Sequence, residues 1–495
     1  RLRMHPLVHV LAARWFDDWP VAERARVQRA IADYYANYSR QPLESRWVGR
    51  DQLNITGSLK WARDAGEQRL VAQLCLGLAD FWIRRGLIAE ALESLPWGME
   101  AAERLVRKAS RRERARYRLD AATLAHFYGV ALQKTGRLDE AAAIFERNRR
   151  TFEQLGDRRG LGKTLNALGA IARQRGHLDE AESLYREALR LHRAVADQEG
   201  EAEALMGLGQ VAAPRGQSER AEEYLRAAMT IYRQFGNRGD EGAALGELGH
   251  IARERGRLDD AERDFQKALE IAEATQSRRE EAALLLALGS LAEIRGRLEA
   301  AEALVQKALG IHREIQERQG EGVDLFELAK IAKERGQFDL AEDYARQALA
   351  IQREVSDRRE QGTCQRLLGQ IAQARGNLDA AEDLLRQALQ ISREVEYRRG
   401  QGIALTALGE VMLALGRTDE AEANFREGLS ILRQVPDRIG SASAELGLGA
   451  LLTVRPDRLQ EGCALLQEAI AILHELGLPD EQKARAIAQQ AGCDA

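Results

Sequence analysis

Three positions of a repeated segment carry side chains whose types could bind a ligand. They lie ten, six and three residues before a glycine that recurs every forty residues, and this spacing places them on one face of a helix. The side chains differ from one copy to the next, and they combine cations, which suit a carboxylate or phosphate, with apolar groups that add affinity. The predicted ligand-binding residues are His126, Arg173, Met206, His250, Arg253, Leu286, Phe326, Lys330, Lys333, Arg366 and Gln370.

Four of these residues, Leu286, Phe326, Lys330 and Arg366, form the cluster with the best case for function. Leu and Phe on an exposed helix face need a reason. The competing interpretation is that solvent-facing helix positions vary freely, and it stays open for any single residue of the set. A neutral or locally charge-complementary ligand, either a peptide or a small metabolite, would fit this mixed surface.

Catalytic and metal-binding interpretations find little support in the sequence. His5 and His9 have the spacing of two metal ligands on a helix, but no third ligand is near them, so a packing role is favoured. We expect His177, His192 and His312 at turns or on outer helix faces, in contact with solvent. Because no nucleophile, base and orienting group can be combined and no G-x-x-x-x-G-K-[ST] loop is present, we predict neither catalysis nor a cofactor in this chain.

The elements that would position the ligand-binding residues are pairs of amphipathic helices. Apolar residues recur at three- and four-residue intervals on both sides of the recurring glycine, which predicts two helices joined by a tight left-handed turn. A second glycine seven residues earlier predicts close approach of two backbones, since glycine inside a helix costs about 1 kcal/mol. The turn glycines are Gly136, Gly176, Gly216, Gly256, Gly296, Gly336, Gly376 and Gly416.

This pattern resembles the tetratricopeptide repeat, with glycine at its eighth position and alanine at its twentieth and twenty-seventh, as Gly169, Ala181 and Ala188 show in one unit. Six residues are added to the usual connector, which is rich in arginine. The resemblance implies an all-α fold, a right-handed α-solenoid of about ten helix–turn–helix repeats over residues 67–495, with capping helices from about residue 441 and a polar tail. Pro214 should either kink its unit or sit harmlessly at a helix end.

The first part of the chain shows a second resemblance. The stretch from Leu59, LKWARDAGEQRLVAQLCLGLADFWIRRGLIAEALESL, is similar to the start of the repeat array in bacterial signal-transduction ATPases with numerous domains (STAND proteins). The opening RLRMHPLVHVLAARWF resembles the end of the winged-helix domain of those proteins. The resemblance implies a winged-helix remnant at residues 1–18, a helical arm at 19–66, and a missing ATPase module of the same polypeptide that responds to an inducer bound by the repeats.

Composition limits the remaining partners and the compartment. The formal net charge is −4 and acidic and basic residues are interspersed, so we predict no direct nucleic-acid binding and no membrane binding. The four cysteines, Cys75, Cys364, Cys463 and Cys493, lack metal or redox spacing, which favours reduced thiols in a cytoplasm. The leading functional hypothesis is a ligand-sensing, autoregulatory region of a STAND ATPase, and the alternative is a constitutive scaffold similar to kinesin light chains or spindle-orientation adaptors.

Overall fold

The computed structural model describes residues 19–38, 45–435, 437–478 and 480–493. The predicted winged-helix remnant at residues 1–18 lies outside this part of the chain. The described chain divides into two compact units, Arg1–Val211 and Ala212–Ala495, which are treated separately below.

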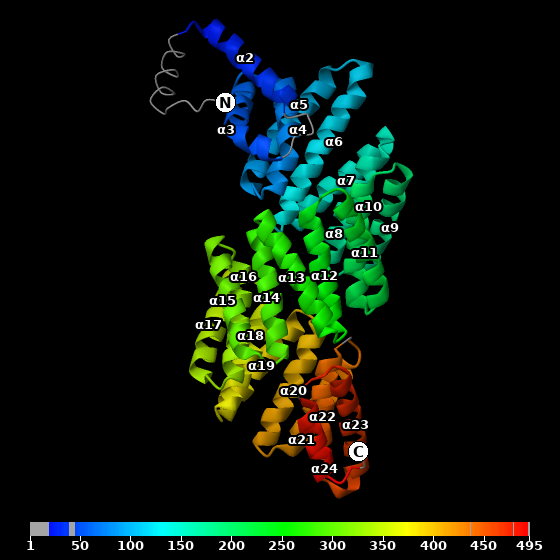
Figure 1. Ribbon diagram of the computed structural model, residues 1–495, viewed down its shortest axis with the longest axis vertical. Helices are drawn as coiled ribbons and strands as arrows, with labels where there is room; N and C mark the ends of the chain where they lie inside the picture. The colour runs from blue at the N-terminus through cyan, green and yellow to red at the C-terminus, as the bar shows by residue number, and fades with distance from the viewer. Residues whose placement is uncertain (1–18, 39–44, 436, 479, 494–495) are drawn as a thin grey trace. The chain divides into compact units, whose positions relative to one another are not determined.

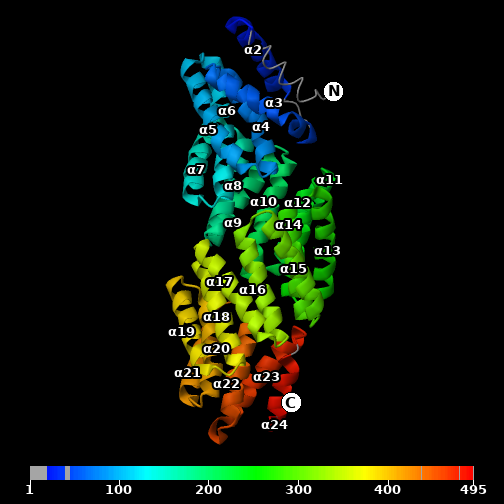
Figure 2. The same cartoon turned by 90° about the vertical axis from the view of Figure 1, so that its left-hand side faces the viewer.

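Antiparallel helix pairs make up almost all of both units, and consecutive helices lie side by side within each (Figures 1 and 2). The first helices of the pairs are α4 (Gln68–Arg84), α6 (Arg111–Lys134), α8 (Arg158–Gln174), α10 (Gln198–Ala212), α12 (Arg238–Glu254), α14 (Arg278–Ile294), α16 (Arg318–Glu334), α18 (Arg358–Ala374), α20 (Arg398–Ala414) and α22 (Arg438–Thr453). The second helices are α5 (Ile88–Lys108), α7 (Leu138–Leu155), α9 (Leu178–Ala194), α11 (Ser218–Gln234), α13 (Leu258–Thr275), α15 (Leu298–Glu314), α17 (Phe338–Glu354), α19 (Leu378–Glu394), α21 (Thr418–Leu432) and α23 (Leu459–Glu475). The predicted all-α solenoid of about ten helix–turn–helix repeats is therefore confirmed.

Two further helices precede these pairs. They are α2 (Val21–Tyr38) and α3 (Ser45–Asp64), and both fall within the segment predicted to be a helical arm. The side of α2 that packs inward is made of small residues, Ala32 and Ala36, while Ile31 and Tyr34 stay exposed. The role of this segment as an arm stays a prediction.

The six residues added to each repeat extend its helices rather than its connector. In the unit around Gly176, α8 and α9 each have 17 residues, and only three residues separate α9 from α10. The arginine-rich connector is in fact the first turn of the next helix: Asp157 caps α8 by accepting hydrogen bonds from the backbone amides of Arg159 and Gly160, both at 3.1 Å. An aspartate before the first turn satisfies amides that the helix leaves without partners.

In most repeats a left-handed residue follows the second helix as well as the first. The first turns use glycine, with Gly176 at φ +80° and Gly256 at φ +73°. The second turns use residues with side chains in most units, for which this conformation is strained. These non-glycine residues with positive φ are Ala196, Gln276, Gln316, Ser356 and Glu396.

Several glycines inside the first helices make room for a side chain of the second helix, whereas a Cβ atom on Gly449 would lie 3.0 Å from the backbone oxygen of Gly462, as the predicted backbone approach requires. A Cβ atom on Gly129 would lie 2.7 Å from the ring of Phe145, and one on Gly409 would lie 2.7 Å from the ring of Phe425. The predicted backbone approach is thus wrong for these units, because a fully buried aromatic side chain of the second helix fills the space. Each such ring buries enough apolar surface to offset the roughly 1 kcal/mol cost of the glycine.

The segment predicted as a polar tail forms a further helix. After α23 the chain turns into α24 (Asp480–Gln490), whose Ala484 and Ala488 are buried. This turn brings Cys493 to Cys463, and the two form a disulfide. The prediction of reduced thiols is wrong for this pair, because the return of α24 over α23 cannot be read from a separation of 30 residues. Cys75 and Cys364 are free and buried, and burial raises both pKa values to about 12.

Pro214 shortens one first helix. α10 ends at Ala212 and a 3₁₀ turn, Ala213–Arg215, leads into Gly216, whereas α8 and α12 continue to two residues before their turn glycines. Proline cannot donate the hydrogen bond that the next α-helical turn needs.

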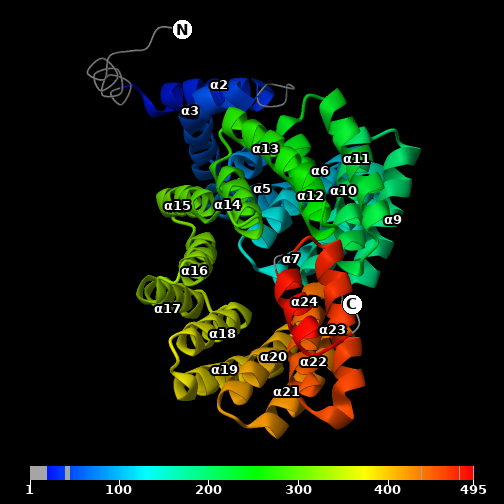
Figure 3. The ribbon, with the colours of Figure 1, turned by 60° about the horizontal axis from the view of Figure 1, so that its bottom comes forward.

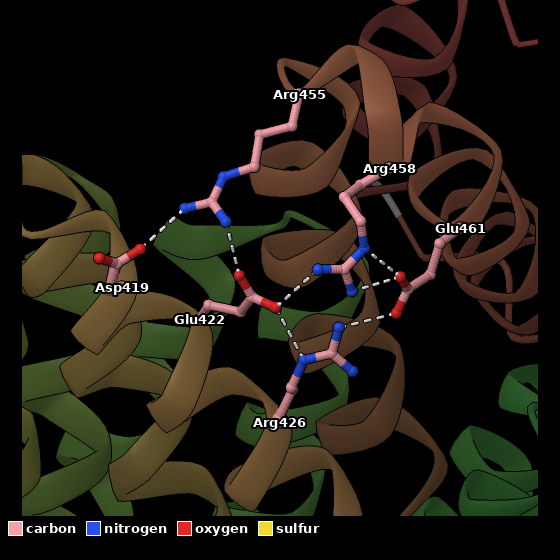
Figure 4. Close-up of polar contacts among 6 residues, drawn as sticks. All are labelled: Asp419, Glu422, Arg426, Arg455, Arg458 and Glu461. Atoms are coloured by element: carbon pink, nitrogen blue, oxygen red, sulfur yellow. Dashed lines mark hydrogen bonds and ion pairs between the residues drawn. The ribbon is translucent and has the colours of Figure 1, made fainter.

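Ion pairs connect successive repeats along one edge. The arginine before a turn glycine, or at the equivalent position of the last repeat, contacts the acidic residues at the start of the preceding second helix. Figure 4 shows the last rung, where Arg455 binds Asp419 at 3.1 Å and Glu422 at 2.9 Å, and Glu422 also accepts from Arg426 and Arg458. We call this series the arginine ladder; its other rungs start from Arg175, Arg255, Arg295, Arg335 and Arg375.

Candidate functional site

The cluster on α16 and α18 lines a cavity of the second unit. Phe326, Lys330 and Lys333 lie at i, i+4 and i+7 of α16, so they share one face of the helix. Arg366 and Gln370 follow the same spacing on α18, and α20 closes the third side with Ile403 and Ala404. The cavity has a volume of about 480 Å³, which lies in the range of small-ligand sites. We call it the α16–α20 cavity.

Five predicted ligand-binding residues therefore meet in one place. Phe326, Lys330, Lys333, Arg366 and Gln370 all line the cavity, and all are partly buried. Phe326 also packs against a buried core cluster, together with Leu286. Its exposed face belongs to the cavity wall, so the ring serves packing and could serve a ligand as well.

Lys330 has two carboxylate partners. Its Nζ atom lies 3.0 Å from Glu293 and 2.8 Å from Glu327. Burial lowers the pKa of Lys330, but the two carboxylates outweigh burial and the pKa is raised overall. Burial also raises the pKa of Glu293 to about 7, although Lys330 acts in the opposite direction. The charge of Lys330 is thus balanced by two carboxylates of the protein itself.

Arg366 and Lys333 have no such compensation. Among the described residues, neither forms an ion pair with a carboxylate, and Arg366 donates one hydrogen bond, to Gln370 at 3.2 Å. Burial lowers the pKa of Arg366, and the nearby Arg399 lowers it further. Burial lowers the pKa of Lys333 as well; the carboxylate of Glu334 offsets part of this effect, whereas Arg366 adds to it. Two partly desolvated cations that repel each other favour an anionic group between them.

The remaining wall of the cavity comes from residues that the sequence comparison missed. Tyr397 and Arg399 stand at the start of α20, and Glu327 and Thr363 lie between the predicted positions. Tyr397 packs its ring 4.0 Å from the guanidinium of Arg359, and Arg399 binds Asp437 at 2.7 Å. One signal was present: Tyr397 occupies a helix-capping position at which the neighbouring units have Asp357 and Asp437.

Three predicted residues of the second unit lie outside the cavity. His250 packs edge-on against Phe265, with ring centroids 4.9 Å apart, and burial lowers its pKa to about 4. Arg253 donates to the hydroxyl of Ser290 at 3.4 Å. Leu286 packs against buried core residues on both sides of α14. None of the three lines the α16–α20 cavity.

The predicted residues of the first unit form a separate group. His126 lies between the rings of Phe127 and Phe145, and burial lowers its pKa to about 4. Arg173 interacts with the phenol of Tyr185, and Met206 is partly buried on α10. A ligand-binding role for these three residues stays a prediction.

Two histidines expected at the surface are buried, which corrects the sequence-based interpretation. His192 is fully buried and its Nδ1 atom lies 2.9 Å from Asp197, while His312 lies 2.5 Å from Asp324. Both occupy the last turn of a second helix, and each ring packs against a glycine of the next first helix, Gly200 for His192 and Gly320 for His312. His177 is exposed, as predicted.

Among the residues that the structure describes, no group of three or more His, Cys, Asp or Glu side chains could hold a metal ion. Within the same residues, no helix is long and apolar enough to cross a membrane.

Models of known families match most of the repeat region. The MalT-like tetratricopeptide repeat region matches residues 241–401. One tetratricopeptide repeat model matches residues 120–194, 165–234 and 200–274, and a further one matches residues 402–427. No curated protein matches the sequence.

Several solved structures are similar in fold. A Rap protein complexed with competence and sporulation factor has 17% identity and a TM-score of 0.50, covering 71% of this chain and 99% of that chain. A STAND protein with a tetratricopeptide repeat sensor from Pyrococcus horikoshii has 17% identity and a TM-score of 0.49, covering 68% of this chain and 52% of that chain. The quorum sensor NprR from B. thuringiensis, in its apo form, has 12% identity and a TM-score of 0.48, covering 70% and 99%.

At these identities the solved structures show the fold alone, while the family models identify the repeat. The chain therefore carries tetratricopeptide repeats over residues 120–427, in an all-α solenoid of helix–turn–helix units of the kind that mediates interactions with other molecules.

Proposed function

We propose that this chain is the ligand-sensing repeat region of a STAND-type signalling ATPase in the cytoplasm, and that its inducer binds in the α16–α20 cavity. The observation that carries the proposal is the pair Lys333 and Arg366, two partly desolvated cations that face a cavity of about 480 Å³ without a carboxylate partner. A protein keeps cations without an ion-pair partner in such a place at a cost to stability, which a bound anion would reduce.

The inducer is a compact molecule or peptide end with a carboxylate or phosphate and an apolar part. The anion would lie between Lys333 and Arg366, and the apolar part would lie against Phe326 and Ile403. The sequence resemblance of the opening residues and of the stretch from Leu59 supports an ATPase module of the same polypeptide as the partner that receives the signal. The chain itself would take no catalytic step.

Thermal-shift screening of the purified chain against carboxylates, phosphate esters and short acidic peptides, followed by calorimetry, tests the site. Lys333→Gln and Arg366→Gln should each weaken a bound compound by about 10- to 100-fold, the range of a charge-assisted hydrogen bond. Matched controls are Lys307→Gln and Arg346→Gln, which change exposed cations on second helices. A compound that binds the four variants alike, or a panel that yields no binder, would contradict the assignment.

The sensor and scaffold hypotheses separate in the full-length polypeptide. For a sensor, a bound compound should raise the rate of ATP hydrolysis, and Arg366→Gln should abolish this response while the basal rate stays unchanged. A constitutive scaffold would bind an extended peptide without changing any ATPase rate.

A further inference from the structure

In the second unit, the turn after α12 contacts the turn between α23 and α24. A Cβ atom on Gly256 would lie 3.8 Å from the carbonyl oxygen of Glu475 and 3.9 Å from the Cα atom of Leu476. Figure 3 shows the end of α12 beside the turn between α23 and α24. Among the described glycines with positive φ, Gly256 is the one that meets another part of the chain; at Gly216 and Gly296, for example, nothing lies within 4 Å. The contact joins the beginning and the end of the unit.

Two carboxylates, one beside this contact and one on α20, interact electrostatically with cations of the α16–α20 cavity. Burial raises the pKa of Glu254, two residues before Gly256, and Arg399 of the cavity wall lowers it. Burial also raises the pKa of Glu410 on α20, while Lys483 of α24 and Lys333 of the cavity both lower it. Glu410 thus lies within electrostatic reach of one cation of the cavity and one of the last helix.

The last helix is fastened to its neighbour by a covalent bond. Cys463 on α23 and Cys493 after α24 form the disulfide, and Leu466, Ile470 and Ala488 pack around it. Arg438 at the start of α22 binds Glu475 at the end of α23, so an ion pair also holds the turn that meets Gly256.

We propose that α23, the turn Glu475–Leu478 and α24 form a clasp that closes the second unit around the α16–α20 cavity, and that the Cys463–Cys493 disulfide sets how readily the clasp opens. A dithiol reductant would transfer two electrons and two protons to the disulfide and leave as a disulfide itself, while Cys463 and Cys493 become thiols. The freed α24 would then be held by the packing of Ala484 and Ala488 and by the contact of Glu481 with His474 at 3.1 Å.

The link to ligand rests on the proposed function. With the clasp closed, a ligand of the α16–α20 cavity would enter and leave more slowly than with the clasp open.

Cysteine cross-linking tests the clasp without any ligand. In Gly256→Cys/Leu476→Cys, mild oxidation should produce an intramolecular disulfide, seen as a mobility shift under denaturing conditions. The matched control is Gly296→Cys/Leu476→Cys, since Gly296 ends the next first helix and has no neighbour. Cross-linking at Gly256 that is no faster than in this control would overturn the clasp, while leaving the ligand site unaffected.

The role of the disulfide is tested in Cys463→Ser/Cys493→Ser. Hydrogen exchange of the turn Glu475–Leu478 and of α24 should accelerate at least about fivefold, because this part of the chain then opens more often. Exchange in α16 to α18 should change little. Equal exchange in the variant and the parent chain would overturn control by the disulfide.

Access to the cavity is tested with an anionic methanethiosulfonate reagent on Thr363→Cys, a cavity-lining position. With the Gly256→Cys/Leu476→Cys cross-link formed, modification should be at least about fivefold slower than with the clasp free. Equal rates would overturn the gating of the cavity, and a slow rate in both states that Lys333→Gln does not alter would count against the anion site instead.

Discussion

Cations of the arginine ladder and cations of the α16–α20 cavity differ in what faces them. Arg455 on the ladder contacts two carboxylates, and Glu422 receives three arginines. Among the described residues, Arg366 in the cavity donates a hydrogen bond only to the side-chain amide of Gln370. The ladder uses its charges to join repeats, whereas the cavity keeps charge available. Pairing, rather than the mere presence of a cation, separates structural arginine and lysine residues from those that can bind a ligand.

The sharpest test of this difference compares two neighbouring cations of the cavity. Lys330→Met should lower the free energy of unfolding by about 1–3 kcal/mol, because Glu293 and Glu327 lose their cation. Arg366→Met should instead raise it by about 1 kcal/mol, because it removes a desolvated charge without a carboxylate partner. Urea denaturation measures both, and equal destabilisation by the two changes would remove the distinction.

Glu422 is the most connected carboxylate of the last ladder rung. Glu422→Gln should lower the free energy of unfolding by about 1–2 kcal/mol, since Arg426, Arg455 and Arg458 share this mostly buried acceptor. Urea denaturation at low and high salt measures the change. An effect below that of a rung with fewer partners would show that the shared carboxylate adds nothing.

Histidines extend the comparison to pH. Burial lowers the pKa of His250 to about 4. Below about pH 6.5 this histidine is therefore protonated in the unfolded chain but stays neutral in the folded chain. Stability should therefore fall as pH drops from 6.5 toward 4, with His250 contributing about 1 kcal/mol or more. His250→Gln should flatten this part of the curve, whereas His474→Gln, at an exposed position, should not. Identical pH curves for both variants would contradict the burial effect.

A single ladder rung should matter least. Glu262→Gln removes the partner of Arg295 and Arg297 and should lower the free energy of unfolding by about 0.2–1 kcal/mol. The effect should shrink in high salt because the pair is partly exposed. A loss as large as that of Lys330→Met would mean that the ladder also carries desolvated charge.

The arrangement of helices in each repeat could be predicted because the same residue pattern occurs many times in the sequence. Turn glycines and small residues recur at one period, so helix number and pairing followed from comparison of the copies. The cavity followed in part, since Phe326 and Arg366 occupy the same position of successive first helices and Lys330 lies one turn after Phe326. Tyr397 and Arg399 were missed because they reach the cavity from the start of a third helix, which a position-by-position comparison does not bring together.

Two features of the structure were not predicted, for different reasons. They are the burial of His192 and His312, and the disulfide between Cys463 and Cys493. The burial of each histidine depends on a glycine of the next repeat, Gly200 or Gly320, which packs against the ring and lies outside the helix that carries the histidine. The disulfide depends on the direction in which α24 leaves the turn after Leu476, and no periodic signal encodes that direction.

The residues with side chains at the second turns make this array an unusual engineering substrate. Ala196, Gln276, Gln316, Ser356 and Glu396 all adopt a conformation that glycine or asparagine accepts with less strain, and they occupy the same place in different repeats. Replacement of Ala196, Gln276, Gln316 and Ser356, one at a time or together, would provide a graded series in which thermal tolerance is adjusted at turns that do not line the cavity; Glu396 is left unchanged because Tyr397 of the cavity wall follows it. Each of these turns is thus a separate position at which a substitution could change the stability of the array.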